Sequence, residues 1–111
     1  MKKLTSVFTV LLLCLSTAVF ADEHLDQALE HANAAVAEGQ AGKAPSLVIH
    51  AKAALEHSLA ASLVAKSLPK GHIDMASEVL QKAIDEGTLN HVQQATKSAE
   101  EAVTHLKAAK K

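Results

Sequence analysis

Apolar residues recur along most of this chain at the three- and four-residue spacing of amphipathic helices. Four such stretches cover residues 23–38, 45–67, 72–86 and 90–109, and none alternates in the manner of a β-strand. Glycine and proline interrupt the pattern between the stretches, at Gly39, Gly42, Pro45, Pro69, Gly71 and Gly87. Because short connections join antiparallel neighbours, the pattern predicts an all-α, up-down-up-down four-helix bundle.

The residues between the stretches predict where the helices begin and end. The glycines that follow the first and third stretches are expected to end them. Pro45 suits the first turn of the second helix, where a missing N–H matters least. Pro69 and Gly71 are expected to separate the second helix from the third. Thr88 or Asn90 is suited to cap the fourth.

The two halves of the bundle are similar in sequence. Residues 24–61 align without a gap with residues 72–109, at a constant offset of 48. The matched positions include His24 with His72, His57 with His105, and Glu38-Gly39 with Glu86-Gly87. Alanine-rich helices match one another easily, but composition does not explain the matched histidines and Glu-Gly pairs. We therefore expect a duplicated helical hairpin.

The N-terminus has the pattern of a cleavable signal peptide. Two lysines precede a mostly apolar run from Leu4 to Phe20, and the residues up to Ala21 suit a signal peptidase. The alternative is a retained membrane anchor, but the run is short and is interrupted by serine and threonine. We expect residues 1–21 to be removed, which leaves a periplasmic domain of residues 22–111 with no stable membrane insertion.

The composition of residues 22–111 excludes several functions. This part of the chain has no Cys, Arg, Phe, Tyr or Trp, and nine Lys stand against twelve Asp and Glu. An acidic balance without aromatic residues argues against nucleic acid as a partner. The sequence signatures of nucleophilic, nucleotide-dependent, haem and di-iron enzymes are absent, so no enzymatic activity is expected. We expect a monomer.

Residues 22–111 are rich in histidine, although they contain no other aromatic residue and no cysteine. All seven histidines lie within residues 22–111, at His24, His31, His50, His57, His72, His91 and His105. In the second helix, Val48, Leu55 and Leu59 define the apolar stripe. His50 and His57 then lie nearly opposite that stripe. The imidazoles are therefore expected on the rim or the outer face of the bundle, where a solvated polar face is the simplest alternative to a metal site.

His50 and His57 are seven residues apart, so they share a helix face but lie about 10 Å apart along the axis. Metal–nitrogen bonds are only about 2 Å long, so one ion does not bridge them. Each is expected to belong to its own site, completed by a neighbouring helix or by carboxylates. The candidate carboxylates are Glu30, Glu38, Glu56 and Glu86. Imidazole with carboxylate suits Cu²⁺, Ni²⁺ and Zn²⁺, and Cu²⁺ binds most tightly in the usual order.

Residues 50–57 read His-Ala-Lys-Ala-Ala-Leu-Glu-His and resemble the repeated His-Ala-x-x-Ala-Val/Leu-x-His unit of the small metal-binding protein family. The resemblance covers essentially all of residues 22–111, including the Glu-Gly turns. It implies an exported, cysteine-free bundle that binds divalent transition metals through histidines.

The repeat unit is only partly kept in the other helices. The first helix keeps His31, with Glu38 at the second position of the unit, and the fourth keeps His105, with Ser98 at the first. The third helix keeps neither histidine, which implies a reduced metal capacity. Three histidines lie outside the unit, namely His24, His72 and His91.

Cleavage after Ala21 would create one further candidate site, at Asp22-Glu23-His24. A free amine, two deprotonated backbone amides and the imidazole of the third residue give four nitrogens in one plane, which Cu²⁺ and Ni²⁺ prefer. The arrangement requires that position two is not proline, and Glu23 meets this condition. Chance placement of a histidine at position three is the simpler explanation in a histidine-rich chain.

These features favour a periplasmic protein that binds or sequesters Cu²⁺, Ni²⁺ or Zn²⁺ through surface histidines, with weaker binding as protons compete for imidazole near pH ~6.5. The alternative is a helical module that docks on an envelope partner, or a pH-sensing structural protein, without a physiological metal. Retention of the untagged protein on immobilised metal would separate the two hypotheses.

Overall fold

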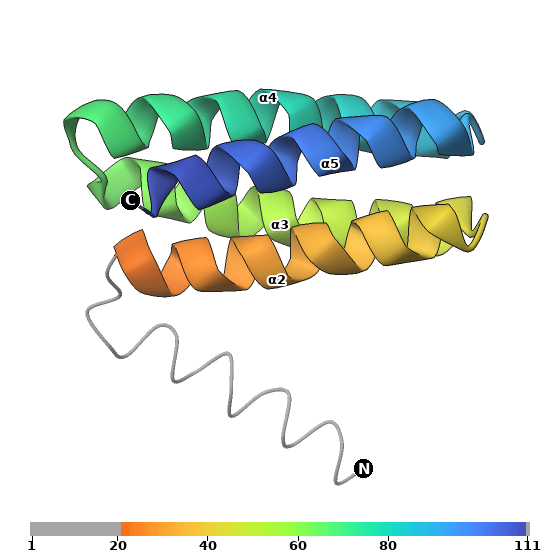
Figure 1. The fold of residues 1–111 in the computed structure, drawn as a ribbon, viewed down its shortest axis with the longest axis horizontal. Coiled ribbons are helices and arrows are strands. Elements are labelled where there is room, and N and C mark those ends of the chain that lie inside the picture. The colour runs from red at the N-terminus through yellow and green to blue at the C-terminus, as the bar shows by residue number, and fades with distance from the viewer. Residues whose placement is uncertain (1–20, 111) are drawn as a thin grey trace, which may run out of the picture.

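The computed structural model describes residues 21–110, which form four helices. These are α2 (Ala21–Gln40), α3 (Ala44–Val64), α4 (Ser67–Thr88) and α5 (Val92–Ala109). Figure 1 shows the helices side by side, each running antiparallel to the next, so the predicted up-down-up-down bundle is confirmed. The expected signal peptide lies, apart from Ala21, outside the described residues.

Each helix packs mainly against two others, and α3 also touches α5 across the bundle. The helix α3 lies between α2 and α4, and α5 closes the bundle by contacting both α4 and α2. The core between them consists mainly of alanine, together with five fully buried larger aliphatic residues: Leu25, Leu47, Ile73, Leu80 and Leu106. Because alanine has only a methyl side chain, the helix axes approach one another closely over most of their length.

The buried stripe of α3 differs from the predicted one. It consists of Ala44, Leu47, Ala51, Ala54, Ser58, Ala61 and Ser62. Leu59, which was expected to face the core, is 51% exposed. The prediction was wrong because α3 is apolar on several sides, and small residues occupy the closest contacts while larger ones lie at the edge. His50 and His57 therefore lie beside the buried stripe rather than opposite it, and both are half-buried.

Pro69 and Gly71 do not separate α3 from α4, as they were expected to do. The helix α4 begins at Ser67 and includes both residues. Pro69 is tolerated because it lies in the first turn, where its missing N–H would have no helical acceptor. The chain direction changes at the preceding residues instead, through the extended backbone of Lys66 and the left-handed conformation of Ser67 (φ 57°).

The turns that close the two hairpins have the same backbone hydrogen bonds at an offset of 48 residues. Gly42 (φ 78°) and Asn90 (φ 65°) occupy equivalent left-handed positions. The amide that follows each of them donates to the carbonyl five residues earlier, from Lys43 to Glu38 at 2.9 Å and from His91 to Glu86 at 2.8 Å. This is the Schellman arrangement of helix C-termini. The repeat in the sequence is therefore matched by repeated turn geometry.

Neither residue predicted to cap α5 does so. Thr88 belongs to α4, and its hydroxyl donates to the Ile84 carbonyl at 2.7 Å. Asn90 ends α4, because asparagine tolerates the left-handed conformation better than most residues. The N-cap position of α5 is occupied by His91, without a hydrogen bond from its side chain.

Gly39 and Gly87, which were expected to end the first and third helices, are required by close contact between helices. Each is buried inside its helix, one residue before the end. A Cβ atom on Gly39 would lie 2.0 Å from Oγ1 of Thr96, and one on Gly87 would lie 2.6 Å from Cγ2 of Val48. At the matched Glu-Gly positions, therefore, a neighbouring helix lies too close for a side chain.

Within residues 21–110, α3 is the one helix long and apolar enough to cross a membrane. In this structure it packs against both α2 and α4. A helix that is apolar on most sides is also typical of the interior of a helical bundle.

Candidate metal centre

Four of the predicted histidines meet along the seam between α2 and α3. In order along the seam they are His50, His31, His57 and His24, which we call the histidine ladder. The ring centroids of successive members are 5.8 Å apart for His50 and His31, 5.8 Å for His31 and His57 and 5.4 Å for His57 and His24. All four side chains are half-buried, so the ladder has one side open to solvent.

The ladder follows from the seven-residue spacing within each helix. His24 and His31 are two turns apart on α2, and His50 and His57 are two turns apart on α3. Because the helices are antiparallel neighbours, the rings of one helix alternate with those of the other. His50 is approached from α2 by His31, and His57 is approached from α2 by both His31 and His24.

The closest approach in the ladder is between His24 and His57, whose Nδ1 atoms are 3.1 Å apart. In the metal-free protein this distance suits a hydrogen bond in which one Nδ1–H donates to the other Nδ1. Two nitrogens bound to one ion at about 2.0–2.1 Å are about 2.9 Å apart at a right angle and about 3.4 Å apart at a tetrahedral angle. The observed separation lies between these two values, so the pair can hold one ion with little movement.

Burial lowers the pKa of His57 below 6.5. Repulsion from the neighbouring imidazoles of His24 and His31 lowers this pKa further, and the carboxylate of Glu56 acts in the opposite direction. The ring therefore stays neutral to a lower pH than an isolated imidazole. A neutral imidazole keeps the lone pair that a metal ion needs.

The rings of His31 and His57 lie nearly parallel, at an interplanar angle of 4°. Those of His31 and His50 are at 29°. Stacked rings present their nitrogens side by side rather than toward one point. A shared ion at either contact therefore requires rotation of the imidazole about its last torsion, which is broad for histidine.

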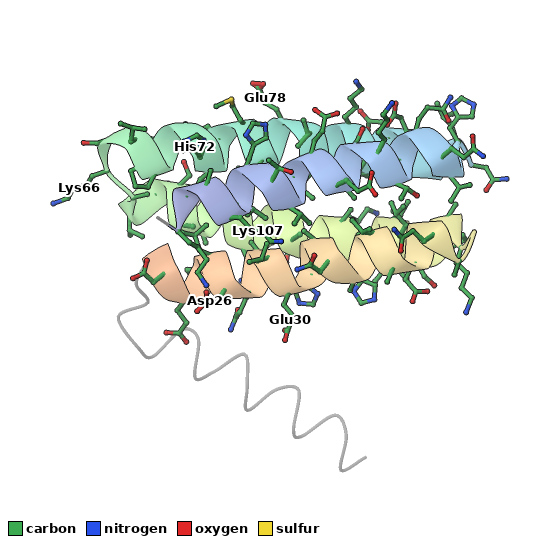
Figure 2. The ribbon with its side chains drawn as sticks, viewed as in Figure 1. Asp26, Glu30, Lys66, His72, Glu78 and Lys107 are labelled. Carbon is green, nitrogen blue, oxygen red and sulfur yellow. The ribbon has the colours of Figure 1, made fainter. Side chains whose placement is uncertain are left out.

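The second hairpin repeats one part of this arrangement. His72 on α4 and His105 on α5 stack with ring centroids 6.4 Å apart. They are the counterparts of His24 and His57 at the 48-residue offset, and Figure 2 shows His72 in the first half of α4, beside α5. The Nδ1 atom of His72 is enclosed, and no residue in the range 21–110 bonds to it. His72, which lies outside the family's repeat unit, thus gives the second hairpin a two-imidazole pair.

The rest of the ladder has no counterpart in the second hairpin. Val79 stands where the first hairpin has His31, and Ser98 stands where it has His50. The Ser98 hydroxyl donates to Oε1 of Glu86 at 2.8 Å. By the same register, Glu38 on α2 lies across from His50 on α3, and it is half-buried.

Several predicted residues lie away from these pairs. His91 is exposed at the N-cap of α5, and it makes none of the ring contacts found among the described residues. Asp22 is exposed in the first turn of α2. Figure 2 shows Glu30, one of the candidate carboxylates, pointing outward from α2. Within residues 21–110, no three His, Cys, Asp or Glu side chains are grouped to hold one ion.

The chain matches one family over nearly its whole length. The family is described as "Small metal-binding protein", and the match covers residues 1–109. That description names metal binding and no catalytic activity. No curated protein matches the chain.

Proposed function

The chain belongs to the small metal-binding protein family, and from this premise we propose that it binds and buffers Cu²⁺, Ni²⁺ and Zn²⁺ at histidine pairs that join neighbouring helices. The observation that carries the proposal is the 3.1 Å separation of the Nδ1 atoms of His24 and His57. Two half-buried imidazoles from different helices already have the spacing that one ion requires.

Two nitrogens from the protein leave the remaining coordination positions of each ion to water or to a solute ligand. Structural zinc sites, in contrast, are usually closed by four protein ligands. A half-open site exchanges its ion readily, which suits buffering or sequestration better than permanent binding.

The arrangement of the pairs suggests how many ions the bundle holds. Each ring serves one ion at a time, so the histidine ladder fills as two pairs, His50 with His31 and His57 with His24. Glu38 is placed to add a carboxylate to the first pair. The pair of His72 and His105 supplies a third site. We therefore propose three interhelical sites, two of them in the first hairpin.

Binding at the His24–His57 pair needs the lone pairs of both Nδ1 atoms, so the ring that carries Nδ1–H must move this proton to its own Nε2. Protonation of either ring to imidazolium removes a lone pair and competes with the metal ion. Affinity therefore falls as pH falls. Because the pKa of His57 is lowered, protons begin to compete with the metal ion at a lower pH than they would at an isolated imidazole.

We further propose that the protein acts in the periplasm after removal of residues 1–21. The basic start and the apolar run that follows support this proposal. Mass spectrometry of the protein recovered from the periplasm would test both the location and the site of cleavage.

Calorimetric titration of His57→Ala with Cu²⁺, Ni²⁺ and Zn²⁺ tests the proposed sites. The variant removes a ring that contacts both His24 and His31. We expect it to lose one bound ion per chain, or to bind that ion at least about tenfold more weakly, as second-sphere and ligand losses commonly produce.

The matched control is His91→Ala, which also removes one imidazole but from an exposed position outside the pairs. It is expected to bind as the unaltered protein does. Equal losses in both variants would contradict the pairing and indicate scattered surface binding. Unchanged binding in both would also contradict a site at His57. No retention of the untagged protein on immobilised metal would favour an interaction module instead.

A further inference from the structure

His24 lies in the first turn of α2, and its side chain can take part in either of two metal sites. Asp22 and Glu23 are exposed, and His24 is half-buried. Nδ1 of His24 faces Nδ1 of His57 at 3.1 Å. The same atom is the imidazole nitrogen that can close a six-membered chelate ring with the amide nitrogen of its own residue.

Cleavage after Ala21 would change the chemistry of this turn. It would give Asp22 a free amine and remove the residues four positions before Glu23 and His24. In a helix, those residues would accept the hydrogen bonds of the two amides. The amide nitrogens of Glu23 and His24 would then have no helical acceptor, so their use as ligands would break no helical hydrogen bond that they donate.

We propose, on the basis of the export and cleavage proposed above, that Asp22-Glu23-His24 becomes a four-nitrogen site for Cu²⁺ or Ni²⁺. The ligands are the amine of Asp22, the amides of Glu23 and His24, and Nδ1 of His24. Binding releases one proton from each amide to solvent, and the amine of Asp22 also gives up its proton wherever it is an ammonium. Square-planar nitrogen coordination suits Cu²⁺ and Ni²⁺, whereas Zn²⁺ has no such geometric preference, so this site separates the metals.

The residues that follow limit how far α2 must unwind. Leu25 is 1% exposed in the core, and Asp26 is held by an ion pair with Lys110 near the end of α5. Figure 2 shows Asp26 beside the C-terminal end of α5. Only residues 22–24 have to leave the helical conformation to bring the four nitrogens into one plane.

One consequence concerns the histidine ladder. Nδ1 of His24 can either bind an ion at the N-terminal site or pair with Nδ1 of His57, but it cannot do both at once. An ion bound at the N-terminal site therefore ends the contact between His24 and His57. His57 then keeps its contact with His31, at 5.8 Å between ring centroids. Processing of the chain thereby changes which histidines pair in the first hairpin.

The test uses the mature protein, with the N-terminus verified by mass spectrometry, titrated with Cu²⁺ and followed by visible absorption and electron paramagnetic resonance. We expect the spectrum of square-planar four-nitrogen Cu²⁺ and the release of two amide protons. One added alanine before Asp22 moves His24 to position four, and Glu23→Pro removes one amide ligand while proline remains acceptable in a first helical turn. Both changes should abolish the four-nitrogen spectrum and leave Zn²⁺ binding unaltered.

An unchanged Cu²⁺ spectrum after addition of the alanine would overturn the proposal, and so would a mature terminus other than Asp22. The variant His57→Ala keeps the inference separate from the proposed interhelical sites. Loss of one bound Zn²⁺ per chain in this variant, with a retained four-nitrogen Cu²⁺ spectrum, supports both proposals. If the unaltered mature protein shows the four-nitrogen Cu²⁺ spectrum but binds no Zn²⁺, the result supports the N-terminal site and contradicts the interhelical sites.

Discussion

His57 is the residue on which most of the metal chemistry depends. It contacts His31 on one side and His24 on the other, and its Nδ1 makes the closest contact between imidazoles in the described part of the chain. Its sequence neighbours do not reveal this role, because the partner rings come from another helix. The seven-residue spacing on both helices was the available signal, and it predicted separate sites without identifying the partners.

The metal-free protein is expected to lose stability as pH falls through the range in which His57 takes up a proton. Its pKa is lowered from 6.5 by burial and by the neighbouring imidazoles, so the unfolded chain binds the proton more readily than the folded one. The contribution is therefore present above pH 6.5 and is lost as pH falls through the lowered pKa. Urea unfolding at a series of pH values measures this loss, and His57→Ala should reduce the pH dependence.

Asp74 provides a second pH-sensitive contact, at the junction of α3 and α4. A hydrogen bond from the Ser62 hydroxyl lowers its pKa below 3.8, and Lys70 contributes further. A lowered carboxyl pKa stabilises the fold above pH 3.8, and this contribution is lost as pH falls through the folded-state value. Nuclear magnetic resonance titration of the Asp74 carboxyl should show a higher pKa in Ser62→Ala than in the unaltered protein. An equal pKa in the two proteins would exclude the hydroxyl as the main cause.

At the scale of the helices, hydrophobic spacing predicted four elements and their antiparallel order but did not predict all their ends. Pro69 and Gly71 were assigned to a loop, although proline is compatible with the first turn of α4 and the helix continues through Gly71. The buried stripe of α3 was assigned to larger residues such as Leu59, whereas alanine occupies the closest contacts. Side-chain size alone cannot orient a helix that is apolar on several sides.

The close crossing at Gly39 predicts that Gly39→Ala destabilises the bundle by about 1–3 kcal/mol, as overpacking usually does. The reason is that the new Cβ would lie 2.0 Å from Oγ1 of Thr96 and 2.7 Å from Cδ1 of Leu47. Chemical denaturation followed by circular dichroism measures the change.

The matched control is Gly71→Ala, near the start of α4, where an added Cβ meets nothing within 4 Å. Alanine has the higher helix propensity, so this variant should be as stable as the original or up to about 1 kcal/mol more stable. A Gly39→Ala protein of unchanged stability would show that α2 and α5 can separate at this crossing without loss.

At the scale of the whole molecule, the two hairpins share their turn geometry but differ in the number of histidines that pair. The turn hydrogen bonds repeat at an offset of 48 residues, whereas the ladder of four rings in the first hairpin is reduced to His72 and His105 in the second. The repeat could be recognised in the sequence, because the alanine-rich composition does not explain the matched histidines and Glu-Gly pairs. The contact between His72 and His105 could not be predicted from the sequence, because it depends on how α4 and α5 pack against each other.

Metal ions are expected to stabilise the entire bundle, because each interhelical pair exists only when its two helices are packed together. An ion present at about 100 times its dissociation constant adds about 2.7 kcal/mol to the free energy of unfolding per site. For a domain of this size that corresponds to a rise in Tm of roughly 10–20 °C. Thermal unfolding with and without Zn²⁺, followed by circular dichroism, measures the rise, and a Tm independent of Zn²⁺ would contradict binding across helices.

The most direct test of the interhelical pairs follows the seven histidine rings individually. Substoichiometric Cu²⁺ would be added to isotope-labelled mature protein carrying one extra N-terminal alanine, which blocks the four-nitrogen site. The ring resonances of His24, His31, His50 and His57 are predicted to broaden first, while those of His91 remain sharp. Broadening of His91 to the same extent as the ladder rings, or an unbroadened ladder, would contradict the account.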